Sequence, residues 1–321
     1  MDLAFATLDV FTSQRLEGNP LAVVRVPASL RDRLTEPMKQ KIAKEFNLSE
    51  TVFLHDDTSK CGPEARDVDI FTIEHELPFA GHPTIGTAVF VRQHLGEEGV
   101  RALATKAGAI GIAPSAALGI RARIPHNVHL HARTLRHLLA AGDTEAAATA
   151  AGLHPDPAVR AAELEAPVFS IVRGMAFVLV RLPSLDLLRR ITPLRLDFAT
   201  LAKSLLDDGW RDSFVSRYYY VDVEPEEEGV RSLRTRMIEL AFEDPATGSA
   251  ATCLGAYLTL AQEKKGTRFR VTQGVEMGRK SVISVETTVE GKGDGGEVTL
   301  GDVYLGGTAV VVMQGTLRVD A

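Results

Sequence analysis

The fold of this chain is indicated by a short stretch of sequence that occurs twice. One copy is Glu243-Asp244-Pro245-Ala246-Thr247-Gly248-Ser249-Ala250, and the other is Gly81-His82-Pro83-Thr84-Ile85-Gly86-Thr87-Ala88. The two copies align without a gap, and their proline, central glycine and final alanine are identical. Proline is tolerated at the first helical position, because the N–H that it lacks would have no partner there. We therefore predict that each copy is a tight turn that opens into a buried helix.

A pair of helix N-termini suggests a binding function. The first turn of a helix presents backbone N–H groups without intrahelical partners and the positive end of the helix dipole. This arrangement suits a carboxylate or an enolate. We expect the rest of the chain to bring the two turns face to face.

Length and composition favour an enzyme of two domains that works on small molecules. A chain of 321 residues is long for a single hydrophobic core, and 45% of its residues are hydrophobic. The net charge of -6 is mild and dispersed, so neither nucleic acid nor a membrane surface is an expected partner. No segment has the roughly 18 uninterrupted apolar residues of a membrane helix. Two cysteines, Cys61 and Cys253, suggest reduced thiols in a cytoplasmic protein.

The first half of the chain predicts a strand at 3–11 that turns at Gly18-Asn19-Pro20 into a second strand at 21–26. A helix is expected over 35–46, with Thr35 as its N-cap, and strands over 51–54 and 68–73. The first turn then leads into a helix at about 84–94. Residues 101–113 alternate weakly, as edge strands do.

The second half repeats this order. Val24-Arg25-Val26-Pro27 is echoed by Val180-Arg181-Leu182-Pro183, each at the end of a predicted hairpin. The expected elements of this half are strands at 168–172, 177–182, 214–223 and 232–240, a helix at 198–207, a surface helix at 145–152 and a turn at 292–296. We infer an internal duplication.

The motifs together resemble those of the PhzF-like family, which is named for the phenazine-biosynthesis isomerase and is related to diaminopimelate epimerase. They occur in order along nearly the whole chain: Asp9-Val10-Phe11, Gly18-Asn19-Pro20, Asn47-Leu48-Ser49-Glu50-Thr51, Phe79 to Thr84, Glu243 to Ala250, Gln273-Gly274 and Gly278-Arg279.

The resemblance implies an α/β fold of two similar domains, each a curved mixed sheet wrapped around a central helix. We expect a first domain over 1–114, joined by the last strand at about 307–321, and a second domain over 115–306. The resemblance also implies an active site in the cleft between them, no cofactor, and a homodimer. No metal is expected, because the sequence lacks the ligand spacing of a metal site.

Glu50 is the main candidate for catalysis. An acidic residue at the start of a strand is unfavourable by propensity, although a solvated glutamate there is an ordinary surface feature. In the family the glutamate of this motif is the general acid/base. Partial burial would raise its pKa towards neutrality, as suits a group that both takes and returns a proton.

The two turns supply the other candidates. Histidine is not a favoured capping residue, so His82 suggests a contact to substrate. Asp244 could cap its helix, contact substrate or do both, and the helix dipole should keep it ionised. We place His82 and Asp244 in the catalytic set with Glu50. Substrate binding is assigned to the remaining candidates, which are Ser49, Gly81, Gly248 and Ser249, and Ser249 resembles a substrate contact of the family.

We therefore predict a cofactor-independent isomerase that shifts a proton on a small carboxylate-bearing substrate. One alternative is a racemase or epimerase, with Glu50 on one face of the substrate and His82 or Asp244 on the other. The related epimerases use a thiol at each turn, and this chain has none there. Another alternative is a catalytically idle binding protein. Motifs for a zinc helix, a phosphate loop, a dinucleotide fold and a serine-hydrolase elbow are incomplete or missing.

Overall fold

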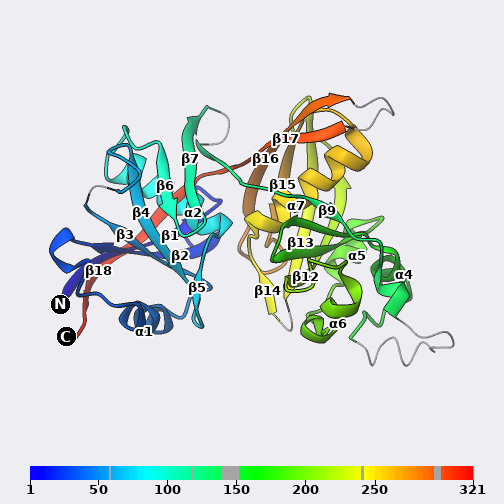
Figure 1. The fold of residues 1–321 in the computed structure, drawn as a ribbon. Helices are drawn as coiled ribbons and strands as arrows, with labels where there is room; N and C mark the ends of the chain where they lie inside the picture. Colours follow the sequence, from blue (N-terminus) through cyan, green and yellow to red (C-terminus); the bar gives the residue numbers. More distant parts are fainter. Residues whose placement is uncertain (58, 117–118, 139–151, 240–241, 293–297, 321) are drawn as a thin grey trace. The chain divides into compact units, whose positions relative to one another are not determined.

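A computed structural model describes residues 1–321 apart from positions 58, 117–118, 139–151, 240–241, 293–297 and 321. The predicted surface helix at 145–152 and turn at 292–296 therefore lie, except for their end residues, outside the described residues. Figure 1 gives the order of the elements along the chain.

The chain divides into two compact units. The first comprises Met1–Ile124, Arg279–Ser284 and Tyr304–Ala321, and the second comprises Pro125–Gly278 and Val285–Val303. The boundary expected after residue 114 falls inside a strand of the first unit, because that strand forms an antiparallel hairpin with the next one. Two long strands near the C-terminus, β16 and β17, each run from one unit into the other.

The elements of the first unit are β1 (Asp2–Val10), β2 (Asn19–Val26), η1 (Ala28–Leu30), α1 (Glu36–Phe46), β3 (Thr51–His55), β4 (Ala65–Phe71), β5 (Glu76–Leu77), α2 (Gly81–Val89), η2 (Phe90–His94), β6 (Ala102–Thr105), β7 (Gly108–Ser115), β8 (Gly119–Arg123) and β18 (Ala309–Arg318). The elements of the second unit are β9 (His129–Leu130), η3 (Leu135–Leu138), α4 (Pro157–Glu165), β10 (Val168–Val172), β11 (Met175–Arg181), α5 (Leu185–Arg189), α6 (Phe198–Leu205), β12 (Phe214–Val223), β13 (Val230–Glu239), β14 (Phe242–Asp244), α7 (Gly248–Leu258), η4 (Thr259–Glu263) and β15 (Thr267–Gln273). β16 (Ser281–Lys292) and β17 (Val298–Gly307) are the shared strands.

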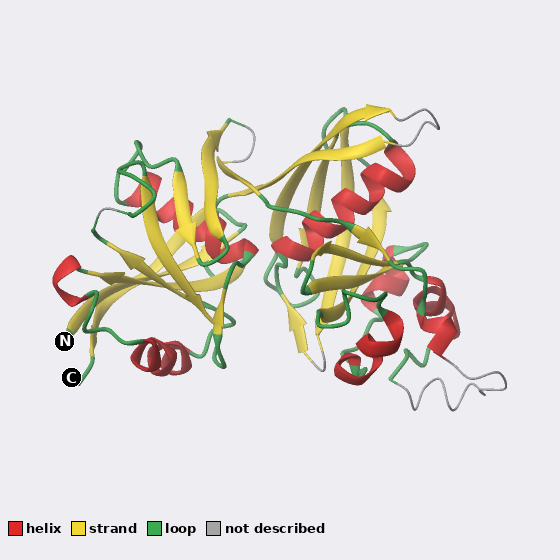
Figure 2. Cartoon of the chain, viewed as in Figure 1, coloured by secondary structure: helices red, strands yellow, loops and turns green. Residues whose placement is uncertain are grey.

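Each unit is a mixed sheet that curves around one buried helix, α2 in the first and α7 in the second (Figure 2). The pairings occur in the same order in both units. β1 and β2 are antiparallel, β2 and β3 parallel, β3 and β4 antiparallel, and β4 and β6 parallel. β10 and β11, β11 and β12, β12 and β13, and β13 and β15 repeat these directions. The inferred internal duplication is therefore visible in the strand topology.

The predicted N-terminal elements form because local pattern and burial agree. β1 and β2 make the expected hairpin, and α1 begins after Thr35, with a proline in its first turn. The apolar side of α1 packs on one face of the first sheet, in a core of eight buried residues: Leu3, Val24, Val26, Leu34, Ile42, Ala43, Phe53 and Phe71.

The opposite face of this sheet carries α2, all of whose residues are buried. Gly86 lets the helix lie close to the strands, since a Cβ atom there would lie 2.6 Å from Leu21 Cδ2 and 2.7 Å from Val10 Cγ2. Gly255 plays the same part in α7, where a Cβ would lie 2.8 Å from Val285 Cγ1. Both helices continue into a π-helical turn, η2 or η4.

No helix in the described ranges is long and apolar enough to cross a membrane. Cys61 is exposed and Cys253 is buried, and neither forms a disulfide.

Candidate active site

The predicted site residues fall into two sets, one in each unit. Ser49 and Glu50 immediately precede β3, and Gly81 and His82 are the first two residues of α2. In the register of β2 and β3, Ala22 lies opposite Thr51, so the preceding residues, Leu21 and Glu50, share the other face of the sheet. Leu21 contacts α2 at Gly86, so this face is the one that carries α2.

The Glu50 carboxyl is enclosed beside the start of α2. Its Oε2 lies 3.7 Å from His82 Nε2, and the two side chains are 17% and 6% exposed. Within the described part of the chain, this Oε2 is buried and has no hydrogen-bond partner. Burial raises the pKa of Glu50 above its ordinary value, and a hydrogen bond with the Ser49 side chain lowers it in part. The carboxyl therefore stays protonated to a pH nearer neutrality than an exposed glutamate does.

The second set surrounds the start of α7. Gly248 and Ser249 are the first two residues of the helix, and Asp244 is the last residue of β14. Asp244 is not the N-cap that its position before a proline suggested. The N-cap is Thr247, because the helix begins three residues later than the sequence pattern indicated.

The position of Asp244 is set by a buried glutamine. The Gln273 side chain, at the end of β15, is fully buried and donates through Nε2 to the Asp244 carbonyl at 2.8 Å and to Thr247 Oγ1 at 3.0 Å. Thr247 Oγ1 in turn donates to Asp244 Oδ2 at 2.5 Å. In the sequence Gln273 belongs to a family motif, and nothing in the neighbouring residues predicts this contact.

An ion pair supports the hairpin of β13 and β14. Arg236 donates from Nε and Nη2 to the Glu243 carboxylate at 2.8 and 2.6 Å, and both side chains are nearly buried. Arg236 also donates to the carbonyls of Leu188, Arg189 and Ile191 near the end of α5. This bidentate contact fixes the strand that ends at Asp244.

The two helix starts correct the alignment of the repeated stretch. Gly81 and Gly248 are the first residues of α2 and α7, so His82 corresponds to Ser249. The ungapped match had paired His82 with Asp244 instead. It failed because Pro83 is the third residue of its helix, whereas the matching proline precedes α7.

The strand register agrees with this correction. Asp244 pairs with Met237 at the end of β14, where the first unit has Leu77 paired with Ile70 at the end of β5. Asp244 is thus a feature of the second unit alone.

Repeated ion pairs give a second set of matching positions. Arg25 binds Asp56 at 2.9 Å at the end of β2, and Arg181 binds Asp222 at 3.0 Å at the end of β11. Glu50 lies six residues before Asp56, and Ser216 lies six residues before Asp222, so these two residues correspond. Ser216 is fully buried, and its Oγ donates to the Ile238 carbonyl at 2.8 Å. The second unit therefore has no acid/base at the position of Glu50.

Two of the other family motifs meet in a structural contact. Arg279 donates to Asp9 Oδ1 at 2.6 Å and to the Gly18 carbonyl at 2.8 Å. The second carboxylate oxygen of Asp9 accepts the Leu16 N–H at 2.6 Å. These residues hold the loop after β1 and need no catalytic explanation.

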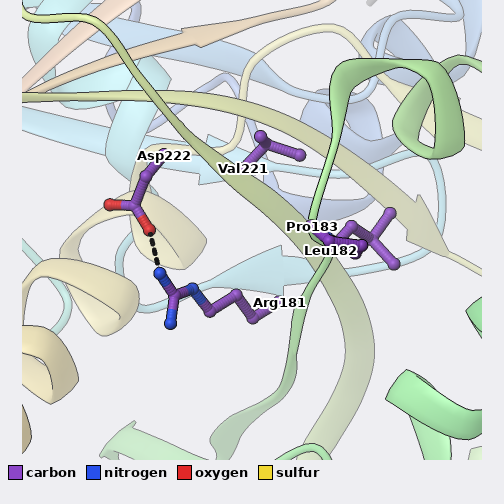
Figure 3. Close-up of a pocket in the computed structure, with 5 residues that line it drawn as sticks. All are labelled: Arg181, Leu182, Pro183, Val221 and Asp222. Atoms are coloured by element: carbon purple, nitrogen blue, oxygen red, sulfur yellow. Dashed lines mark ion pairs between the residues drawn. The ribbon is translucent and has the colours of Figure 1, made fainter.

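A pocket of about 440 Å³ lies elsewhere in the second unit (Figure 3). It is lined by Arg181, Leu182, Pro183, Val221 and Asp222, and the Arg181–Asp222 ion pair lies across it. None of the predicted site residues lines this pocket. Its ion pair corresponds to Arg25–Asp56 in the first unit, so the internal duplication explains why these charged residues are present.

His129, His131 and Asp207 bring potential metal-binding atoms within 4.8 Å of one another. However, both ring nitrogens of His131 already form hydrogen bonds, so neither can coordinate a metal. Its Nδ1 accepts the Asp207 N–H at 3.1 Å, so its Nε2 carries the proton and bonds to Ser170 Oγ at 2.9 Å. His129 Nε2 bonds to Asp207 Oδ2 at 2.8 Å. The cluster is a hydrogen-bonded link between β9, β10 and the end of α6.

This link makes the stability of the protein sensitive to acid. Burial, and to a smaller extent His129, lower the pKa of His131 to about 4, with Asp207 acting in the opposite direction. The unfolded chain, in which the histidine pKa is about 6.5, therefore binds a proton more readily than the folded chain. We expect the free energy of unfolding to fall by about 2 kcal/mol between pH 6.5 and pH 4 through this group, and to gain nothing from it above pH 6.5.

Urea unfolding at several pH values checks the expectation. His131→Asn should have a flatter pH dependence in this window than the wild type, and His75→Gln, at an exposed histidine, should not. If the free energy of unfolding of His131→Asn depended on pH as steeply as that of the wild type, the protonation of His131 would not be the cause of the acid sensitivity.

The family model described as phenazine biosynthesis-like protein matches residues 8–315. This chain belongs to that family. An uncharacterized isomerase of Mesorhizobium japonicum is 35% identical to it over 326 residues, which cover 96% of each chain. A trans-2,3-dihydro-3-hydroxyanthranilate isomerase of Pseudomonas chlororaphis is 29% identical over 321 residues, 98% of each chain. The family assignment and these relatives make the chain an isomerase.

Solved structures agree on the fold. A phenazine biosynthesis protein of Bacillus anthracis superposes with a TM-score of 0.72 at 24% identity, covering 99% of this chain and 100% of that one. A hydroxyproline epimerase of Agrobacterium vitis gives a TM-score of 0.58 at 12% identity, covering 100% and 93%. The predicted α/β fold of two similar curved sheets, shared with the epimerases, is confirmed.

Proposed function

We propose that this isomerase shifts a proton between two carbons of a small carboxylate-bearing substrate without a cofactor or metal. Glu50 takes the proton from one carbon and returns it to another. We assign substrate contacts to Gly81 and His82 in the first unit and to Asp244, Gly248 and Ser249 in the second unit. The catalytic set of the proposal is Glu50, His82 and Asp244, with Ser49 supporting the glutamate.

The observation that carries the proposal is the state of the Glu50 carboxyl. A buried oxygen without a hydrogen-bond partner costs stability unless a ligand uses it. Its neighbour His82 lies close enough to share a substrate atom. A pKa raised by burial places the carboxyl where it can act as base and then as acid.

The ends of the two buried helices support anion binding. Neither α2 nor α7 has a side-chain cap at its N-terminus. The backbone N–H groups of a first turn stabilise negative charge, and charge develops on the substrate when its proton leaves. A substrate carboxylate and the developing enolate are the two anions that these helix ends suit.

One base rather than two is supported by the duplication. The counterpart of Glu50 is Ser216, a hydroxyl that already donates to a carbonyl. The counterpart of His82 is Ser249. Of the other two members of the predicted catalytic set, His82 lies beside Glu50 itself, and Asp244 accepts a hydrogen bond from Thr247.

Turnover in deuterated water tests the proposal. The first compound to try is trans-2,3-dihydro-3-hydroxyanthranilate, the substrate named for the Pseudomonas relatives, followed by other small unsaturated acids. We expect an isomer with a displaced double bond and incomplete deuterium, since a shielded glutamate returns part of the original proton. Inversion at a single carbon with full deuterium uptake would instead establish the epimerase alternative. Metal analysis of the active protein and light scattering test the proposed metal independence and homodimer.

A further inference from the structure

We propose that Gln273 and Thr247 are positioning residues that fix the direction and the proton affinity of the Asp244 carboxyl. The inference rests on the proposed function for the role of Asp244 at the site. The hydrogen bonds from which it is argued join residues of the second unit.

The orientation of the Gln273 amide is fixed by backbone groups. The Thr247 N–H needs an acceptor, and Oε1 lies 3.3 Å from it. The Asp244 carbonyl needs a donor, and Nε2 lies 2.8 Å from it. The flipped amide would place Nε2 against the Thr247 N–H and Oε1 against the Asp244 carbonyl, so these backbone groups allow only one orientation.

The remaining contacts of the amide complete a buried network. Tyr218 Oη lies 3.0 Å from Gln273 Oε1 and 3.0 Å from Thr235 Oγ1. Nε2 donates its second proton to Thr247 Oγ1 at 3.0 Å. All four hydrogen-bonding positions of the amide are therefore used, and the side chain has no freedom to turn.

The Thr247 hydroxyl links the Gln273 amide to the Asp244 carboxyl. Its hydroxyl accepts from Gln273 and must donate its single proton elsewhere, and Asp244 Oδ2 lies at 2.5 Å. Each bond in such a chain polarises the next one. A donor aimed at the carboxylate stabilises its ionised form.

The Thr247 hydroxyl bonds to Asp244 although the residue stands at a helix N-cap. Threonine at an N-cap ordinarily bonds through its oxygen to an N–H of the first helical turn. Thr247 is the N-cap of α7 and makes no such bond. The hydroxyl is committed to Asp244 instead, and the start of α7 is left without a side-chain cap. One residue thus orients the carboxyl and keeps the helix end open.

The test is a carboxyl titration followed by carbon-13 NMR, with aspartate labelled at Cγ and the Asp244 signal assigned through Asp244→Asn. Thr247→Val keeps the shape of the side chain and removes the donor. We expect the midpoint of the Asp244 titration to rise by about one pH unit in Thr247→Val, and to return close to the wild-type value in Thr247→Ser. Gln273→Met should move it in the same direction by a smaller amount.

Thr252→Val is the matched control, since its buried hydroxyl bonds within α7, to the Gly248 carbonyl at 3.0 Å. It should leave the Asp244 titration unchanged. Equal midpoints in wild type and Thr247→Val would overturn the proposal, even if the variant is less stable. The titration needs no substrate, so its result is separate from failure of the proposed reaction.

Discussion

Glu50→Gln should lower turnover by about 10²–10⁴-fold, the range typical for loss of a general acid/base. Glutamine keeps the shape of the side chain and removes the titratable group. Because the proton is moved by this carboxyl in the proposed reaction, the loss should appear in kcat, with little change in KM if chemistry is slow. Steady-state kinetics on the substrate found by the deuterium experiment gives the measurement.

The same substitution should not destabilise the protein. Burial raises the pKa of Glu50, so the folded chain holds this proton more tightly than the unfolded chain does. Stability from this group is therefore present below the ordinary glutamate pKa and lost as pH rises through the folded value. Glu50→Gln should be as stable as the wild type or more stable at pH 7.

Glu45→Gln is the matched control, at an exposed glutamate of α1. It should change neither turnover nor stability. Turnover of Glu50→Gln within tenfold of the wild type would remove Glu50 from the mechanism, and a loss of folded protein would make the kinetic result a packing effect.

Glu163→Ala should cost about 3–5 kcal/mol of stability, because it leaves a buried cation without its counter-ion. Glu163 on α4 and Arg217 on β12 are 0% and 2% exposed, and their charged atoms lie 2.9 Å apart. The Glu163 carboxylate also accepts from Tyr219 Oη at 2.5 Å and from the His154 N–H at 2.7 Å. Removing the carboxylate leaves all three donors without this acceptor.

Trp210 is the single tryptophan of the chain and lies in the second unit with this ion pair, so its fluorescence in urea reports the unfolding of that unit. Glu165→Ala is the control on the same helix. It removes an exposed ion pair with Arg136, which should be worth less than about 1 kcal/mol. If Glu163→Ala were as mild as Glu165→Ala, the buried pair would not be holding α4 to the sheet.

Replacing both members of the pair separates charge from packing. Glu163→Leu with Arg217→Met removes the buried charges together, and the double variant should lose less stability than the sum of the single ones. The free energies from the same urea experiment give the coupling.

Local patterns in the sequence determined much of the fold. The alternation of residues 3–11, the Gly-Asn-Pro turn and the helical spacing of 35–46 are each read from neighbouring residues, and β1, β2 and α1 follow them closely. The repeated arginine and proline at the ends of β2 and β11 also showed the duplication. Burial and backbone propensity act over a few residues, so a sequence pattern is sufficient to predict them.

Only the tertiary structure decided which residues correspond and what each contacts. The ungapped match paired His82 with Asp244, whereas the helix starts pair His82 with Ser249 and the repeated ion pairs match Glu50 with Ser216. Gln273 reaches Asp244 from 29 positions away in the chain, and Arg217 reaches Glu163 from 54. Such contacts depend on which strands become neighbours and in what register. A shift of one residue turns every side chain to the other face of the sheet, and no local pattern fixes that choice.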